Sequence, residues 1–203
     1  MTTFAHKIIA ATFAIAFAGS ASAATLSESS FGDFSGDFHA PTVIGNGATV
    51  VDGVWSGGGD TDLLAFTGLA SGAQTVTLSF APLSPIGDTD WSFSAGGVVN
   101  YKTTPFQYSA WEGTTLANVG IAHWNRNGVF DYTINLDNSF AGSLYLGLFG
   151  TYGSLKYTIS APGNAAPVVV PPPVSAVPLP AAAPLLLAGL GALGLAARRR
   201  RRA

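Results

Sequence analysis

The chain has 203 residues, which suits one modest domain with appendages. It contains no cysteine, and this excludes disulfides, zinc–thiolate centres and cysteine nucleophiles. All eleven Asp and Glu residues lie between residues 24 and 161, where only three Lys and Arg residues oppose them, although the whole chain sums to −2. Because an acidic domain repels phosphate backbones, we expect no nucleic-acid partner.

The first 23 residues have the pattern of a secretory signal peptide. Lys7 gives a weakly basic start, and residues 8–18 form an apolar core of the usual length. Ala21 and Ala23 make a small-residue cleavage site, so we expect signal peptidase to leave Ala24 as the first mature residue. The alternative is a membrane anchor, but the apolar run is shorter than the roughly 20 residues that span a bilayer.

Residues 24–161 are expected to form an all-β body. Apolar and polar residues alternate with a period of two, as in half-buried strands, at residues 74–81, 129–136, 143–150 and 154–161. Weaker strand patterns lie at residues 48–54, 62–66, 91–95, 98–102 and 106–111. Glycine-rich turns, among them Gly96-Gly97, separate the strands. Asn127-Gly128 predicts a tight hairpin, and Thr151-Tyr152-Gly153 can close the last hairpin, between residues 143–150 and 154–161. This pattern favours an antiparallel β-sandwich or jelly roll, with a closed barrel as the alternative.

The C-terminal part differs in composition. Residues 162–176 are uncharged and proline-rich, which predicts an extended spacer. Residues 181–197 are apolar and just long enough for a transmembrane helix. After export, the basic end of the chain is expected to stay on the cytoplasmic side and to stop transfer. It consists of Arg198, Arg199, Arg200, Arg201 and Arg202.

A short proline motif, Val177-Pro178-Leu179-Pro180-Ala181, precedes the apolar segment. The motif, the short apolar segment and the basic end together resemble the PEP-CTERM family of bacterial sorting signals, in its VPLPA-type variant. Leu179 stands where the general motif has glutamate. The resemblance covers residues 177–203 only. A plain single-span anchor is the alternative.

The resemblance implies a destination and a processing enzyme. The precursor would pass through the inner membrane of a Gram-negative bacterium, and an exosortase would cut it near the motif. The body would then be released or re-attached at the cell surface, often alongside exopolysaccharide.

The sequence Gly-Asp-Thr-Asp occurs twice, at residues 59–62 and 87–90. Aspartates two residues apart at the start of a strand project to the same side. Asp60 with Asp62, and Asp88 with Asp90, are therefore candidate calcium ligands, and no other cofactor is expected. The alternative is that these side chains hydrogen-bond the turn backbone. The first copy and the strand after it also resemble bacterial pre-peptidase C-terminal domains, which are small β-sandwiches appended to secreted proteins.

Catalytic signatures are absent from the sequence: it has no G-x-S-x-G elbow, H-E-x-x-H helix or phosphate loop. Aromatic residues are a better guide, since exposed ones stack on sugar rings or anchor interfaces. Trp111 and Trp124, which stand beside polar residues near turns, are the candidates.

The sequence therefore predicts a non-enzymatic structural or adhesive protein of the cell surface or polysaccharide matrix. A carbohydrate- or calcium-binding module is the alternative, and a hydrolase is the least favoured class.

Overall fold

The computed structural model describes residues 24–166 and Arg198. The predicted signal peptide, the sorting motif and the predicted C-terminal helix lie outside the described residues, apart from Arg198. In the described part of the chain, no helix is long and apolar enough to cross a membrane.

The described body is built almost entirely of strands, with one helical turn near its start and two later 3-10 turns. Its elements in chain order are β1 (Ala24–Ser27), α1 (Glu28–Phe31), β2 (Thr42–Ile44), β3 (Ala48–Ser56), β4 (Thr61–Phe66), β5 (Gln74–Pro82), β6 (Ser94–Lys102), β7 (Thr114–Ala122), η1 (His123–Asn125), β8 (Phe130–Leu136), β9 (Leu144–Tyr152), β10 (Ser154–Ser160) and η2 (Pro162–Asn164).

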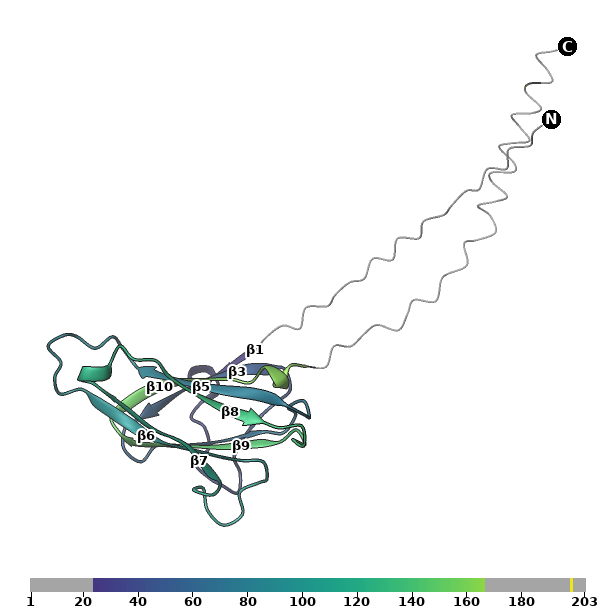
Figure 1. The fold of residues 1–203 in the computed structure, drawn as a ribbon, viewed down its shortest axis with the longest axis horizontal. Helices are drawn as coiled ribbons and strands as arrows, with labels where there is room; N and C mark the ends of the chain where they lie inside the picture. The colour runs from purple at the N-terminus through teal and green to yellow at the C-terminus, as the bar shows by residue number, and fades with distance from the viewer. Residues whose placement is uncertain (1–23, 167–197, 199–203) are drawn as a thin grey trace. The chain divides into compact units, whose positions relative to one another are not determined.

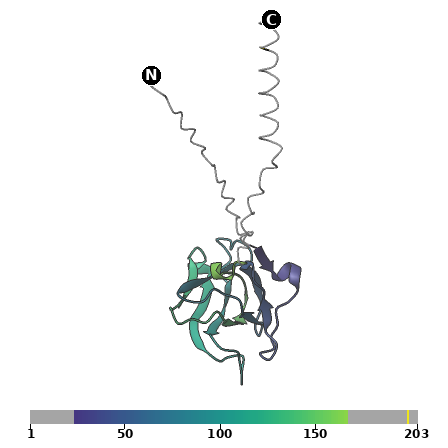
Figure 2. The same ribbon diagram turned by 90° about the vertical axis from the view of Figure 1, so that its right-hand side faces the viewer.

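The strands form two five-stranded sheets packed face to face (Figure 1). The first sheet has the order β1-β3-β10-β5-β8 and the second β2-β4-β9-β6-β7. Figure 2 shows β1 and α1, in purple, at one edge of the two layers. The predicted all-β sandwich is thus confirmed. The edge strands β1 and β2 differ from the expectation of a purely antiparallel body, because each pairs in parallel with its neighbour, β3 and β4 respectively.

Most connections carry the chain from one sheet to the other. Among the described strands, only β6 and β7 are consecutive in sequence and paired in the same sheet. The two predicted hairpins are therefore wrong. Asn127-Gly128 leads from β7 in one sheet to β8 in the other, and Tyr152-Gly153 leads from β9 to β10 in the same way. Turn residues show where the chain reverses, but they do not say which sheet receives the next strand.

The hydrophobic core lies between the two sheets and follows the predicted alternation. Leu155, Tyr157 and Ile159 of β10 all point inward, as do Val76, Leu78 and Phe80 of β5. A smaller cluster of Leu63, Phe106 and Phe149 forms a separate group. Leu63 and Phe149 alternate with the core residues Leu64 and Leu148, so this cluster covers the outer face of β4 and β9.

The region from residue 91 to 122 departs most from the predicted strands. Gly96 and Gly97 do not separate two strands but lie inside β6, beside a register shift against β9. A β-carbon at Gly97 would overlap the carbonyl of Phe149, so glycine permits this close approach of two strands. Residues 106–111 form a loop rather than a strand. The strand β7 was not predicted, because its small residues weaken the alternation of apolar and polar side chains.

The packed body extends beyond residue 161. Asn164 of η2 is buried, and its side-chain amide donates to the carbonyls of Gly45 and Ala48 at 2.8 and 2.9 Å. Ala70 also donates its N–H to the carbonyl of Gly163. These bonds attach η2 to the body.

Candidate functional site

The first Gly-Asp-Thr-Asp segment places its two aspartates in different environments. Asp60 lies in the turn before β4 and accepts hydrogen bonds from the N–H and the hydroxyl of Ser56, at 2.6 and 2.9 Å. Asp62 lies on β4, on the same inward face as Leu64 and Phe66, and has no exposed surface. Asp60 thus closes a turn, whereas Asp62 is a carboxyl group inside the sandwich.

Tyr157 is the hydrogen-bond donor of Asp62. Its hydroxyl donates to Asp62 Oδ2 at 2.7 Å across the space between the sheets. Gly53 of β3 makes room for this arrangement, since a β-carbon there would overlap the ring of Tyr157. The second oxygen, Asp62 Oδ1, is buried and has no hydrogen-bond partner among the described residues. A buried polar atom without a partner costs roughly 1–3 kcal/mol, so its presence calls for an explanation.

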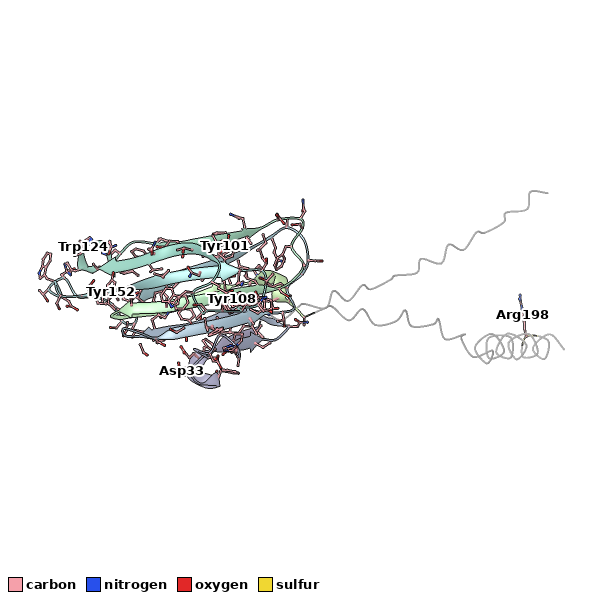
Figure 3. All side chains as sticks on the ribbon, turned by 90° about the horizontal axis from the view of Figure 1, so that it is seen from below. Asp33, Tyr101, Tyr108, Trp124, Tyr152 and Arg198 are labelled. Atoms are coloured by element: carbon pink, nitrogen blue, oxygen red, sulfur yellow. The ribbon has the colours of Figure 1, made fainter. Side chains whose placement is uncertain are left out.

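Two acids from the N-terminal segment complete a cluster around Asp62. Carboxylate oxygens of Glu28, Asp33 and Asp62 lie within 4.8 Å of one another. Glu28 opens α1 and is held by the N–H groups of Val54 at 2.6 Å and Phe34 at 3.4 Å. Asp33 follows α1 and is exposed at the edge of the body (Figure 3). We call Glu28, Asp33 and Asp62 the acidic cluster.

The acidic cluster favours protonation of the buried Asp62 and the half-buried Glu28. Burial raises the pKa of Asp62 to about 8, opposed by the Tyr157 hydroxyl and reinforced by the charges of Glu28, Asp60 and Asp33. Burial also raises the pKa of Glu28, although the N–H groups of Val54 and Phe34 oppose this shift. The pKa of Tyr157 is well above its ordinary value, mainly because the ring is buried and secondly because Asp62 is close.

This arrangement fits a hard divalent cation. Carboxylate oxygens are the ligands that calcium prefers, and three of them meet here with one oxygen otherwise unbonded. A bound cation would replace the repulsion among the carboxylates with attraction.

The second Gly-Asp-Thr-Asp segment lies in the exposed loop between β5 and β6. Asp88, whose side chain is 94% exposed, pairs with Arg126 at 2.5 Å between Oδ1 and Nη2. Asp90 accepts a hydrogen bond from the hydroxyl of Ser92 at 3.0 Å. Both side chains of this copy are thus at the surface.

The two candidate tryptophans lie on different loops. Trp111 precedes β7 and stacks on Phe149, whereas Trp124 of η1 is 82% exposed and has no aromatic partner among the described residues. Figure 3 labels Trp124 at one end of the body. Another exposed tryptophan, Trp91, lies over the buried ring of His123 with 4.0 Å between ring centroids. His123 therefore packs beneath an aromatic ring.

Comparison with known proteins adds a family match for the tail. Residues 176–202 match the family model of the PEP-CTERM protein-sorting motif. This match indicates an exported protein that is targeted to an exosortase and processed at the membrane toward the cell surface. It covers the predicted sorting motif and all five arginines of the basic end.

Among solved structures, the body is similar to a pre-peptidase C-terminal domain. The pre-peptidase C-terminal domain of a collagenase from Bacillus anthracis shares 20% sequence identity and has a TM-score of 0.34. The alignment covers 59% of this chain and 91% of that domain. The chain has no significant match among curated proteins.

Proposed function

We propose that the protein is an exosortase substrate whose body has a structural or adhesive role at the cell surface or in an exopolysaccharide matrix. The observation that carries this proposal is the match of residues 176–202 to the sorting motif. The exosortase would cut near Val177–Ala181, after signal peptidase has cut near Ala23. The role is non-enzymatic, and its contacts are weak and multivalent.

The acidic body suits this destination. Eleven acids against three bases give residues 24–161 a formal charge of −8. Net charge far from zero keeps a protein soluble and disfavours self-association. An exported domain without cysteines must also hold together through its core, and the two packed sheets provide one.

Cell fractionation tests the proposed route. Deleting the exosortase gene, or changing both Pro178 and Pro180 to Ala, is expected to leave export intact while the uncut precursor accumulates in the inner membrane. A strain without exopolysaccharide is expected to lose the protein from its matrix fraction into the medium. Normal release of the double-proline variant would contradict processing at this motif. Unchanged retention without exopolysaccharide would contradict the matrix role.

A second candidate function, calcium binding, is favoured by the acidic cluster. The specific observation is the buried, unbonded Oδ1 of Asp62 beside the carboxylates of Glu28 and Asp33. These three residues would hold the ion, with water as the remaining ligands. Bound calcium would supply the positive charge that this group of acids lacks and would attach the N-terminal segment to β4.

Isothermal titration of calcium into the metal-stripped protein tests this second function. The wild type is expected to bind with saturation, Asp62→Asn to lose the binding, and the matched control Asp90→Asn to retain it. The absence of saturable binding to the wild type, or unchanged binding to Asp62→Asn, would contradict a calcium site at the acidic cluster.

A further inference from the structure

The loop between β6 and β7 is held in one conformation by a single acid. Glu112 pairs with Lys102 at 2.5 Å between Oε2 and Nζ, and both side chains are largely buried. Glu112 Oε1 also accepts the N–H groups of Gln107, Tyr108 and Ser109. The ion pair with Lys102, followed by these N–H groups, lowers the pKa of Glu112 to about 2. We call residues 103–113 the clasped loop.

Trp111 is the aromatic residue that the clasped loop holds in place. Its ring stacks on Phe149 of β9 with 3.7 Å between ring centroids and 12° between ring planes. Its carbonyl accepts a hydrogen bond from the side-chain amide of the buried Asn100 at 3.1 Å. Phe149 belongs to the buried cluster on the outer face of β4 and β9. One face of the indole is thus fixed against the sheet.

The other face of Trp111 is open to solvent. The residue is 56% exposed although its ring is stacked, so the exposed area lies on the side turned away from Phe149. Tyr108, on the same loop and visible in Figure 3, is 86% exposed. A flat, immobilised and exposed aromatic face loses little conformational entropy when a ligand stacks on it.

The charges on and beside the clasped loop favour an uncharged ligand over an anionic one: the loop has no net charge once its ion pair is counted, and the acid Asp137 lines a pocket with Thr103 and Thr104. Lys102 and Glu112 neutralise each other. The remaining exposed polar groups of the loop are uncharged: Thr103, Thr104 and Gln107. The body as a whole carries a formal charge of −8 and repels anionic chains. Hydroxyl and amide groups beside a flat apolar face match a pyranose ring, which has an apolar C–H face and a rim of hydroxyls.

We propose that Trp111 and the clasped loop form a stacking site for an uncharged polysaccharide. The site deepens the proposed matrix role, on which it rests, by giving that role a ligand class and a place on the body. Trp124 differs because no aromatic ring among the described residues lies beneath it. It provides a control with a more exposed indole on a different loop.

Binding to immobilised polysaccharides tests the site with the full chain in mild detergent. The probes are hydroxyethyl cellulose, xyloglucan, mannan and dextran as uncharged chains, and alginate as the anionic control. We expect the wild type to bind at least one uncharged chain in preference to alginate. Trp111→Ala should weaken that binding about tenfold, whereas Trp124→Ala should stay within about twofold of wild type.

Near-ultraviolet circular dichroism would reveal whether Trp111→Ala disturbs folding. Two milder variants test the site in that case. Trp111→Phe preserves a ring on Phe149 with a smaller exposed face and should weaken binding a few-fold. Glu112→Gln loosens the loop and should weaken binding while leaving the indole present. Equal binding by wild type and both Trp111 variants would overturn the site.

Two other outcomes overturn the ligand class. Preference for alginate would contradict an uncharged ligand, and a wild type that binds no polysaccharide but captures a protein would contradict a glycan site. These failures are separate from that of the proposed function. If the protein is processed normally and retained by exopolysaccharide while Trp111→Ala binds normally, the matrix role stands and only this site is wrong.

Discussion

Two copies of one four-residue sequence have opposite environments in this protein. The copy at residues 59–62 leads directly into β4 and places Asp62 inside the sandwich, bonded to Tyr157 and close to Glu28. The copy at residues 87–90 lies in a loop, where Asp88 pairs with Arg126 at the surface. The residues that follow explain the difference. Leu64 and Phe66 continue the inward face that Asp62 begins, whereas the segment after Asp90 turns before β6 starts at Ser94.

The comparison shows that burial, rather than the local motif, determines the chemistry of these aspartates. An exposed aspartate is solvated and contributes little to stability. A buried one must be protonated, hydrogen-bonded or bound to a cation. The following predictions separate the two copies, and they run from the largest expected effect to the smallest.

The largest difference between the two copies is expected in how the free energy of unfolding of the metal-free protein depends on pH. The pKa of Asp62 is about 8 in the folded protein and has an ordinary value of 3.8. Between these values the folded state keeps a proton that the unfolded state releases. The free energy of unfolding therefore falls as pH rises, by up to about 1.4 kcal/mol per pH unit, and the loss is complete above pH 8. Urea unfolding in EGTA from pH 5 to 8 should show a shallower fall for Asp62→Asn, and the wild-type fall for Asp90→Asn.

The next largest effect is expected from calcium. At a free calcium concentration one hundredfold above the dissociation constant, the free energy of unfolding of the wild type should rise by about 2.7 kcal/mol. Asp62→Asn should lose this increment, because the ion loses a buried ligand, while Asp88→Asn should retain it. Thermal unfolding with calcium and with EGTA measures the increment. An equal increment in all three proteins would place the ion elsewhere.

Removing the hydroxyl of Tyr157 should have a smaller effect. Tyr157→Phe takes away the donor of Asp62 Oδ2 and leaves both carboxyl oxygens of Asp62 without a partner. We expect a loss of about 1–2 kcal/mol in the free energy of unfolding in EGTA. Tyr132→Phe is the matched control, since it removes the hydroxyl of another tyrosine that packs against the core. If Tyr132→Phe lost as much free energy of unfolding as Tyr157→Phe, the hydrogen bond to Asp62 would contribute nothing beyond the general effect of removing a tyrosine hydroxyl.

The smallest effects are expected at the second copy. Asp88→Ala removes an ion pair whose acid is almost fully exposed, and Asp90→Ala removes one bond to Ser92. Each should change the free energy of unfolding by no more than about 0.5 kcal/mol in urea titrations at pH 7. A loss of several kcal/mol at either residue would mean that the two copies are equivalent after all.

The sequence indicated the strands better than their connections. Half-buried strands leave a period of two, so the inward faces of β5, β8, β9 and β10 could be predicted from their own residues. Which sheet each strand joins depends on contacts between distant segments, and the Asn127-Gly128 turn contains no information about them. The glycines of β6 were misleading because glycine serves close strand packing as well as turns.

The sequence likewise indicated only some of the residues that form each candidate site. The burial of Asp62 is signalled by Leu64 and Phe66, which share its face of β4. Its association with Glu28 and Asp33 is not, because that depends on how the N-terminal segment packs along β3. Trp111 was a candidate because of its polar neighbours in the sequence. Its stacking on Phe149 and the ion pair between Glu112 and Lys102 could not be predicted, because only the fold brings these residues together.

The destination of the protein depends on its tail, and the mass of its mature form tests that claim most directly. The surface or matrix form, purified from the native cell, should begin at Ala24 and end near Ala181, without the apolar segment and the arginines. Intact-mass spectrometry would identify both ends in one measurement. A mature form that still carries Arg202 would contradict exosortase processing and leave a protein that is simply anchored by its C-terminus.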